Sequence, residues 1–360
     1  MRLRTVRILQ PGQKIRVLVV DDSVVIRQLV CHALAEDPEI EVVGVAANGR
    51  IALNRLPQLN PDLITLDIEM PELDGLGMLK ELRRRDRAIP VVMFSTLTER
   101  GASATFEALS LGADDYVTKA SNAGSLDVSL ANLRHELVPK IRQFFDFAQA
   151  QPVPQAPSHR AVVPASSHCQ RLAVAIGVST GGPAALATVI PQFPDAFRLP
   201  IFIVQHMPPL FTRLLAERLD TLTPLGVREG VDGEIAEAGR IYVAPGDRHM
   251  RVVNSGLGPT ITLDQGPPLN SCRPAVDALF NSLADVYGAG VVAAVLTGMG
   301  HDGMTGAERL AARGAYILAQ DEDTSVVWGM PGSVVSAGVA NQILPLDSVV
   351  PAILREVNGI

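Results

Sequence analysis

Short apolar runs recur in the first part of the chain, and stretches of helical length with one apolar face separate them. Strands that alternate with helices in this way form a doubly wound parallel sheet. The pattern predicts five strands, at residues 15–20, 41–46, 63–68, 90–95 and 115–118. Apolar residues at helical spacing then predict a further helix from about Leu126 to Phe147.

The alternation resumes near residue 169 and predicts a second α/β domain of Rossmann-like type. Its strand-like runs are residues 172–176, 200–205, 240–244, 291–296 and 315–319. Two further runs, 251–253 and 260–263, are joined by a glycine-containing loop and predict an antiparallel hairpin. The second domain is therefore expected to carry a β-hairpin insertion.

Composition marks the boundaries between these parts. Residues 151–167 are rich in Pro, Ala and Ser and have no apolar periodicity, which is typical of a linker. We expect a loose N-terminal extension at residues 1–13 and a first domain at 14–135. A connecting helix and linker follow at 136–168, and the second domain occupies 169–360.

Charge and cysteine content exclude several classes of protein. A net charge of −7 offers no broad basic surface for nucleic acid. The apolar runs are too short to span a bilayer, and residues 1–13 lack the apolar stretch of a signal peptide, so we expect no direct membrane insertion. Three scattered cysteines fit a reducing compartment rather than a disulfide framework. These features predict a cytoplasmic protein.

Polar residues follow three strands of the first predicted sheet. Asp21 and Asp22 come after the first strand, Asp67 ends the third, and Lys119 follows the fifth. The carboxyl ends of parallel strands meet at one edge, so these side chains can converge. Clustered carboxylates suit Mg²⁺, which lets an anionic phosphoryl donor approach Asp67. Ser95, at the end of the fourth strand, can hydrogen-bond a phosphoryl oxygen.

The motifs around these residues resemble the response-regulator receiver domain; they are Val19–Ser23, Leu66–Pro71, Asp74-Gly75 and Tyr116–Lys119. The resemblance implies that Asp67 is the phosphoacceptor. It also implies that Asp21, Asp22 and the backbone carbonyl of Glu69 bind Mg²⁺ with Asp67. Ser95 and Lys119 are then expected to contact the phosphoryl group, and Tyr116 to report the change by rotating inward.

A glycine-rich turn opens the second domain. Residues 175–183, which contain Gly177-Val-Ser-Thr-Gly181, follow a predicted strand and precede a helical run, so Ser179 falls near a helix N-terminus. Three interpretations fit this segment: a turn with a capping serine, a phosphate site, or a nucleophilic serine at an elbow. The segment alone favours the first two.

A nucleophilic serine needs a base and an orienting carboxylate. His206 follows the next strand, and Asp302 follows the run at 291–296. His301 is the rival base, but adjacent side chains on a loop usually point apart, which favours His206. The chain order Ser, His, Asp argues against an ordinary α/β-hydrolase, in which the order is Ser, Asp, His.

The second domain also resembles a known family, the CheB chemotaxis methylesterases. The resemblance is carried by Ile176–Pro183, Val204–Pro208, Val243–Met250, Cys272–Asp277 and Leu296–Gly300. It implies that Ser179 is the nucleophile, His206 the base and Asp302 its orienter, with Thr180 and Met299 near the oxyanion. His301 departs from the family, in which Asn is common at this position.

The resemblance implies hydrolysis of glutamate γ-methyl esters and deamidation of glutamines on chemotaxis receptors. A chemotaxis histidine kinase is the implied phosphodonor, and the esterase reaction needs no cofactor. We expect the receiver to block the esterase until Asp67 is phosphorylated. A binding module that holds a phosphorylated ligand at the glycine-rich turn is the alternative. It is less favoured, because such a site needs neither His206 nor Asp302. A DNA-binding output is less favoured still, since no recognition-helix unit is evident.

Overall fold

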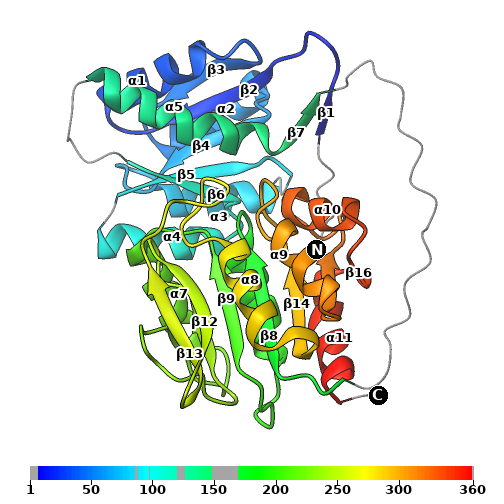
Figure 1. Cartoon of the computed structure of the whole chain (residues 1–360). Helices are drawn as coiled ribbons and strands as arrows, with labels where there is room; N and C mark the ends of the chain where they lie inside the picture. The colour runs from blue at the N-terminus through cyan, green and yellow to red at the C-terminus, as the bar shows by residue number, and fades with distance from the viewer. Residues whose placement is uncertain (1–6, 86–87, 97, 120–125, 148–168, 359–360) are drawn as a thin grey trace. The chain divides into compact units, whose positions relative to one another are not determined.

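The computed structural model describes residues 7–85, 88–96, 98–119, 126–147 and 169–358. The chain divides into two compact units, Met1–Val153 and Pro154–Ile360. Both are α/β units built on parallel sheets with packed helices, as the sequence predicts (Figure 1).

Five strands of the described part of the first unit form a parallel sheet in the order β3-β2-β4-β5-β6. They are β2 (Ile15–Val20), β3 (Ile40–Ala46), β4 (Leu63–Asp67), β5 (Val91–Ser95) and β6 (Asp115–Thr118). The strands β2, β4 and β5 are buried along almost their whole length, as expected of strands covered on both faces. The edge strand β3 is exposed or half-buried between its two ends. All five lie where the sequence predicts them, with ends shifted by at most one residue.

Helices cover both faces of this sheet. They are α1 (Val24–Ala35), α2 (Gly49–Leu59), α3 (Gly75–Arg85), α4 (Glu99–Ser110) and α5 (Leu126–Arg142). Helix α1 packs against α5, while α3 packs against both α2 and α4. Asn48 and Thr98 begin α2 and α4 by accepting hydrogen bonds from the backbone with their side chains.

Two sequence expectations need correction at the ends of this unit. The helix predicted to reach Phe147 ends at Arg142, and β7 (Phe145–Phe147) follows. The extension predicted to be loose contains β1 (Arg7–Leu9), which pairs in parallel with β7. The physical reason is burial: Leu9 and Phe145 are 2% and 5% exposed, and pairing satisfies the backbone beside them.

The second unit is also a parallel sheet, and its described strands run in the order β10-β11-β9-β8-β14-β15-β16. They are β8 (Ala173–Val178), β9 (Ile201–Gln205), β10 (Val227–Glu229), β11 (Ile241–Val243), β14 (Val291–Val295), β15 (Tyr316–Gln320) and β16 (Gln342–Leu344). The edge strands β10 and β16 are not among the predicted strands, because their residues are only partly buried and form no apolar run. The predicted hairpin is present and longer, as β12 (His249–Ser255) and β13 (Gly258–Asp264).

The helices of the second unit form two groups. One group comprises α6 (Gly182–Val189), α7 (Pro209–Asp220) and α11 (Leu346–Asn358), in which α6 contacts both of the others. The other comprises α8 (Val276–Val286), α9 (Met304–Ala312) and α10 (Gly329–Ser336), in which α9 contacts both of the others. Strand order reverses around β8, so the carboxyl ends of β9, β8 and β14 form a switch point, where such sheets place their sites. Across the described residues, no helix combines the length and the apolar character that crossing a membrane requires.

Candidate active sites

The acidic residues predicted to converge in the first unit do so. The Lys119 Nζ atom lies 2.8 Å from Asp67 Oδ1 and 3.0 Å from Asp21 Oδ2. Asp67 Oδ1 also accepts a hydrogen bond from the Ile68 amide at 2.8 Å. Asp21 and Asp67 are buried and Asp22 is exposed. The site is therefore a buried pair of carboxylates with one ammonium group between them.

Burial sets the protonation of this site. Loss of solvent raises the pKa of Asp67 to about 6, and the negative charge of Asp21 adds to this, while the hydrogen bond from Lys119 opposes it. Burial also tends to lower the pKa of Lys119, but its bonds to Asp67 and Asp21 outweigh that effect and raise it. The ammonium group thus stays charged, and the carboxylates stay crowded.

The donor set fits a hard divalent cation. Asp21, Asp22 and Asp67 each offer a carboxylate oxygen, and these atoms lie within 4.8 Å of one another. Asp21 Oδ2 is buried, and within the described chain its one polar partner is the Lys119 ammonium group at 3.0 Å. An all-oxygen site of this kind suits Mg²⁺. The Glu69 side chain points to Arg100, at 3.5 Å.

Ser95 and Tyr116 lie close to the acidic pocket but face elsewhere. The Ser95 hydroxyl accepts a hydrogen bond from Thr105 Oγ1 at 2.6 Å and lies 3.2 Å from the carbonyl oxygen of Gly101 on α4. Its side chain therefore engages α4 rather than Asp67. Tyr116 is already buried, with the Lys140 ammonium 4.9 Å from its ring centroid.

The Asp74-Gly75 motif has a steric cause. A Cβ atom at position 75 would lie 2.1 Å from the carbonyl oxygen of Asp67. The Gly75 amide also donates a hydrogen bond to the carbonyl of Ile68 at 2.9 Å. Helix α3 can therefore start directly against the strand end that carries Asp67 only if residue 75 is glycine.

In the second unit, Ser179 occupies a tight turn between β8 and α6. Its amide donates to the Thr297 carbonyl at 3.0 Å, and its carbonyl accepts from the Gly182 amide at 2.8 Å. Gly181, in the left-handed region at φ 77°, is the residue before α6. A Cβ atom at Gly298 would lie 2.8 Å from Ser179 Cβ. Close approach of two strand ends thus requires small residues around the serine.

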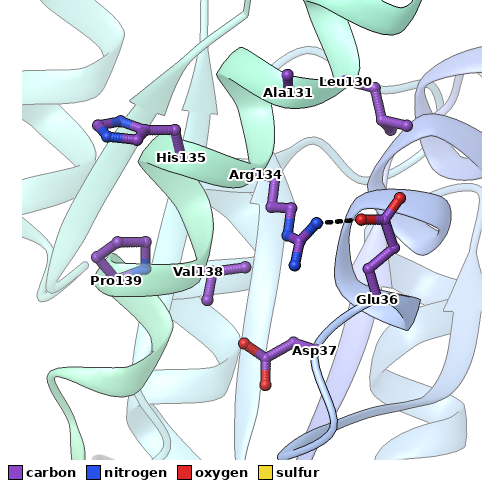
Figure 2. Close-up of a pocket in the computed structure, with 8 residues that line it drawn as sticks. All are labelled: Glu36, Asp37, Leu130, Ala131, Arg134, His135, Val138 and Pro139. Atoms are coloured by element: carbon purple, nitrogen blue, oxygen red, sulfur yellow. Dashed lines mark hydrogen bonds and ion pairs between the residues drawn. The ribbon is translucent and has the colours of Figure 1, made fainter.

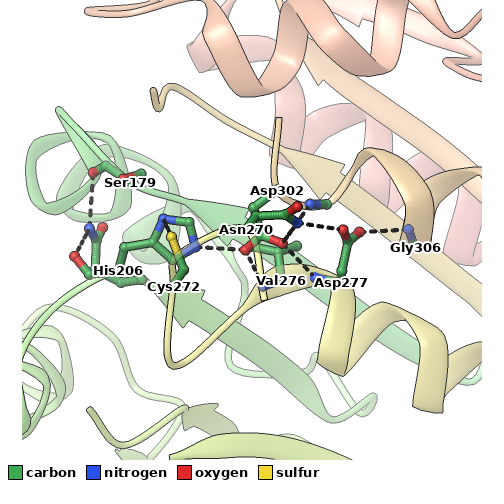
Figure 3. Close-up of polar contacts among 10 residues, drawn as sticks. Ser179, His206, Asn270, Cys272, Val276, Asp277, Asp302 and Gly306 are labelled. Atoms are coloured by element: carbon green, nitrogen blue, oxygen red, sulfur yellow. Dashed lines mark hydrogen bonds and ion pairs between the residues drawn. The ribbon is translucent and has the colours of Figure 1, made fainter. Parts of the chain in front are cut away.

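The structure joins His206 to Asp302. The imidazole Nε2 atom lies 2.8 Å from Asp302 Oδ2, in a hydrogen bond from ring to carboxylate (Figure 3). His206 follows β9, and Asp302 follows β14 on the other side of β8. The rival His301 is exposed while Asp302 is buried, so these adjacent side chains point apart, as the sequence analysis expects.

Backbone amides surround the Asp302 carboxylate. Oδ2 also accepts from the Val276 amide at 2.6 Å, and Oδ1 accepts from the amides of Asp277 and Gly303, both at 3.1 Å. Asn270 Nδ2 donates to Oδ1 at 3.0 Å. Two of these amides belong to the first turn of α8, whose preceding residue supplies no side-chain cap. Asp302 therefore caps a helix and orients a histidine with the same group.

This network shifts the pKa values of His206 and Asp302 in opposite directions. Burial tends to lower the pKa of His206, but its hydrogen bonds to Asp302 and Cys272 outweigh burial and raise it. Burial tends to raise the pKa of Asp302, but the bond from His206 and the backbone donors lower it. Asp302 is therefore a stable carboxylate, and His206 is more basic than an ordinary histidine.

Ser179 and His206 are neighbours across two strands. Val178 and Gln205 are paired in register, and the next residues along β8 and β9 are Ser179 and His206. Adjacent strands lie about 4.8 Å apart, which puts both side chains at one edge. Among the hydrogen bonds of the described residues, none joins the Ser179 hydroxyl to the imidazole. Such bonds are often longer in a free enzyme and shorten when substrate binds.

Of the two residues predicted near the oxyanion, Thr180 follows Ser179 in the chain and Met299 follows Gly298, where an added Cβ atom would lie 2.8 Å from Ser179 Cβ. Thr180 is buried, and its carbonyl accepts a hydrogen bond from Thr297 Oγ1 at 2.9 Å. Met299 is 40% exposed, and its amide donates no hydrogen bond within the part of the chain that is described. Trp328 lies beside this loop through a bridge to Gly298.

Sequence reasoning missed the roles of two residues in this site. Asn270 Nδ2 bridges Asp302 and Asp277, at 3.0 and 2.9 Å. Cys272 Sγ lies 3.6 Å from His206 Nδ1. For Cys272 the only available signal was the Cys272–Asp277 motif, whose resemblance to the family assigns no role to the cysteine. Asn270 lies outside every motif of the sequence analysis.

A separate groove of about 610 Å³ lies between α1 and α5 of the first unit. Figure 2 shows Arg134 paired with Glu36 across it, with His135 and Pro139 along its wall. It holds neither the phosphorylation candidate nor a nucleophile next to a base, so it does not compete with the two sites above.

Comparison with known proteins assigns a known domain family to each unit. The family model of the CheB methylesterase matches residues 174–353, and that of the response regulator receiver domain matches residues 17–131. A relative from Trichodesmium erythraeum (strain IMS101) is named protein-glutamate methylesterase/protein-glutamine glutaminase. It is 47% identical over 355 residues, which cover 96% of this chain and 99% of the relative. A relative of the same name from Nocardioides sp. (strain ATCC BAA-499 / JS614) is 49% identical over 355 residues, covering 96% and 95%.

A solved structure, the CheB methylesterase catalytic domain of Thermotoga maritima, is 40% identical with a TM-score of 0.51. The match covers 53% of this chain and 100% of that domain. The fold and these matches define an enzyme class: a receiver domain joined to a hydrolase of esters. The chain belongs to the CheB methylesterase family.

The raised pKa of Asp67 predicts an effect on stability. Ionising a carboxyl group whose pKa is about 6 rather than 3.8 costs about 2–3 kcal/mol at neutral pH. Asp67→Asn should therefore raise the free energy of unfolding of the receiver by about 1–3 kcal/mol at pH 7 without Mg²⁺. The gain should shrink as pH falls from 6 to 4, because the native carboxyl group then becomes neutral.

Calorimetry of the full chain measures this free energy of unfolding. The transition that belongs to the receiver is identified as the one that Mg²⁺ shifts in the unchanged protein. Asp146→Asn, at an exposed position of β7, is the matched control and should change little. A variant at Asp67 that is no more stable than the parent at pH 7 would contradict the prediction.

Proposed function

We propose that this chain hydrolyses glutamate γ-methyl esters on chemotaxis receptors, deamidates specific glutamines there, and is activated by phosphorylation. One observation carries the proposal. The Ser179 turn, the His206 imidazole and the Asp302 carboxylate follow three neighbouring strands of one sheet, with the imidazole and carboxylate 2.8 Å apart. The names of curated relatives that match over nearly the full length support the same chemistry.

In the proposed reaction, Ser179 attacks the side-chain carbonyl and His206 accepts its proton. Because Asp302 holds Nε2, Nδ1 is the ring nitrogen available to the serine. The imidazolium then protonates the leaving methanol, or ammonia when the substrate is glutamine. Water hydrolyses the acyl-enzyme with His206 again as base. Asp302 orients the ring and stabilises its charged form.

Thr180 and Met299 are proposed to border the oxyanion. The Met299 amide donates no hydrogen bond to any of the described residues, which supports this role, since a free backbone donor can bind the developing negative charge. A donor of this kind contributes about 3 kcal/mol to lowering the barrier. The esterase reaction is proposed to need no cofactor.

Asp67 is proposed to accept phosphate from a chemotaxis histidine kinase in the cytoplasm. Asp21, Asp22, Asp67 and the Glu69 carbonyl would hold Mg²⁺, which offsets carboxylate repulsion when it is bound. Lys119 and Ser95 would then contact the phosphoryl group. For Ser95 this requires leaving its bond with Thr105 on α4, so phosphorylation changes α4 contacts.

A methanol-release assay on methylated receptor tests the proposed chemistry. Ser179→Ala should reduce release to the level of uncatalysed hydrolysis, because the nucleophile is gone. Ser333→Ala is the control, since the Ser333 hydroxyl, among the residues that the structure describes, bonds only to the carbonyl of Met330 on its own helix. Full methanol release by the Ser179 variant would rule out the acyl-enzyme mechanism.

The His206–Asp302 pair predicts a pH profile. A general base must be neutral, so kcat/KM should rise with pH through a pKa above the ordinary histidine value of 6.5. Asp302→Asn removes the group that raises this pKa, so the rising limb should move to lower pH while kcat/KM falls about 10³- to 10⁴-fold. If the rate falls and the limb stays in place, Asp302 has only a structural role.

Phosphorylation is tested with beryllofluoride and Mg²⁺, which mimic an aspartyl phosphate. They should raise the esterase rate of the full chain and leave Asp67→Asn at its basal rate. Asp146→Asn should respond like the parent. Activation of the Asp67 variant to the same degree would show that the effect does not pass through this carboxyl group.

A further inference from the structure

Cys272 occupies a position that the proposed reaction does not use. Its Sγ atom lies 3.6 Å from Nδ1 of His206, the ring nitrogen that Asp302 leaves available (Figure 3). The side chain is only partly buried. A thiol that served packing alone would face apolar atoms, whereas this one faces a ring nitrogen of His206.

The turn that carries Cys272 fixes the thiol there. Leu269 and Cys272 exchange two backbone hydrogen bonds, of 3.0 and 2.8 Å. Asn270 and Ser271 between them both have positive φ, 50° and 63°, as in the tight turns of hairpins. The Asn270 side chain in turn bonds to Asp302. The thiol, the imidazole and the carboxylate therefore form one connected unit.

The spacing of the two atoms matches a pair of ligands on a soft metal ion. A tetrahedral Zn²⁺ with its usual bonds to sulfur and nitrogen sets these atoms about 3.6 Å apart. The observed Sγ–Nδ1 distance is 3.6 Å. One ligand atom each from His206, Cys272 and Asp302 lies within a 4.8 Å span.

The carboxylate behind the ring strengthens this match. Histidines that bind metal usually donate their other ring N–H to a carboxylate, which fixes the ring and raises its basicity as a ligand. Asp302 does this for His206 through Nε2 at 2.8 Å. Two protein ligands leave the remaining positions of the metal open to water or to a hydroxyl group.

We propose that Cys272 Sγ and His206 Nδ1 form a binding site for a thiophilic divalent cation such as Zn²⁺, and that occupancy of this site inhibits the enzyme. Binding exchanges two metal-bound waters for the thiolate and the imidazole, and the protons of the thiol and of the imidazolium Nδ1 pass to solvent. The metal then holds the nitrogen lone pair that Ser179 needs. Mg²⁺ should not act here, because it prefers oxygen ligands. The metal binding is independent of the proposed function, whereas the inhibition rests on the proposed function, in which His206 is the base.

Cobalt spectroscopy tests the binding on the full chain, with excess Mg²⁺ present to occupy the carboxylates of the receiver. Co²⁺ should give a thiolate-to-metal charge-transfer band that Zn²⁺ removes. The band should be lost in Cys272→Ser and kept in Cys169→Ser, which removes an exposed thiol. A band that is absent from the parent, or that persists in the Cys272 variant, overturns the site.

Methanol release tests the inhibition, with each variant compared with its own rate in chelator. Loss of a residue that only hydrogen-bonds a metal ligand typically lowers metal affinity by roughly 10–100-fold. Because Cys272 is proposed as a ligand itself, the Zn²⁺ concentration for half inhibition should rise by more than this in Cys272→Ser. Cys169→Ser should match the parent. Equal sensitivity of all three proteins overturns the inhibition. If no protein releases methanol, the proposed function fails while the cobalt band still decides the metal site.

Discussion

The buried carboxylate of Asp302 is the constraint on which the second unit depends. A negative charge that is 2% exposed is stable only when donors surround it. The amides of Val276 and Asp277 at the start of α8, the Asn270 side chain and the His206 ring together fulfil this need. Removing the charge therefore disturbs a helix start, a tight turn and a catalytic candidate at once.

The two units place carboxylates at the same position of a parallel sheet, but the electrostatic surroundings of these carboxylates differ. In each, polar residues gather at the carboxyl edge of a parallel sheet, where backbone turns leave room for chemistry. In the receiver, burial and, to a smaller extent, the charge of Asp21 raise the pKa of Asp67, and the clustered carboxylates leave capacity for a cation. In the second unit, internal hydrogen-bond donors satisfy the Asp302 carboxylate, which in turn raises the pKa of the His206 imidazole.

The sequence predicts those features of the two sites that depend on where the parallel strands end. Asp67, Lys119, His206 and Asp302 lie where apolar runs stop, so their convergence follows from parallel pairing. Side-chain direction does not follow from it: Ser95 faces α4, and Ser179 makes no hydrogen bond to the imidazole in the described structure. Short pairings such as β1 with β7, and contacts such as Cys272 with His206, depend on tertiary packing that leaves no periodic pattern.

Trp328 gives the second unit a built-in optical probe. It is the single tryptophan of the sequence, it bridges to Gly298, and its indole N–H donates to the Gln320 carbonyl at 3.0 Å. Gly298 in turn touches the backbone of Ser179. Intrinsic emission excited at the indole therefore reports on the second unit, at a position one bridge away from the loop that packs on the serine turn. The receiver contributes no indole to that signal, so events at Asp67 become visible without a label only when they reach the other unit.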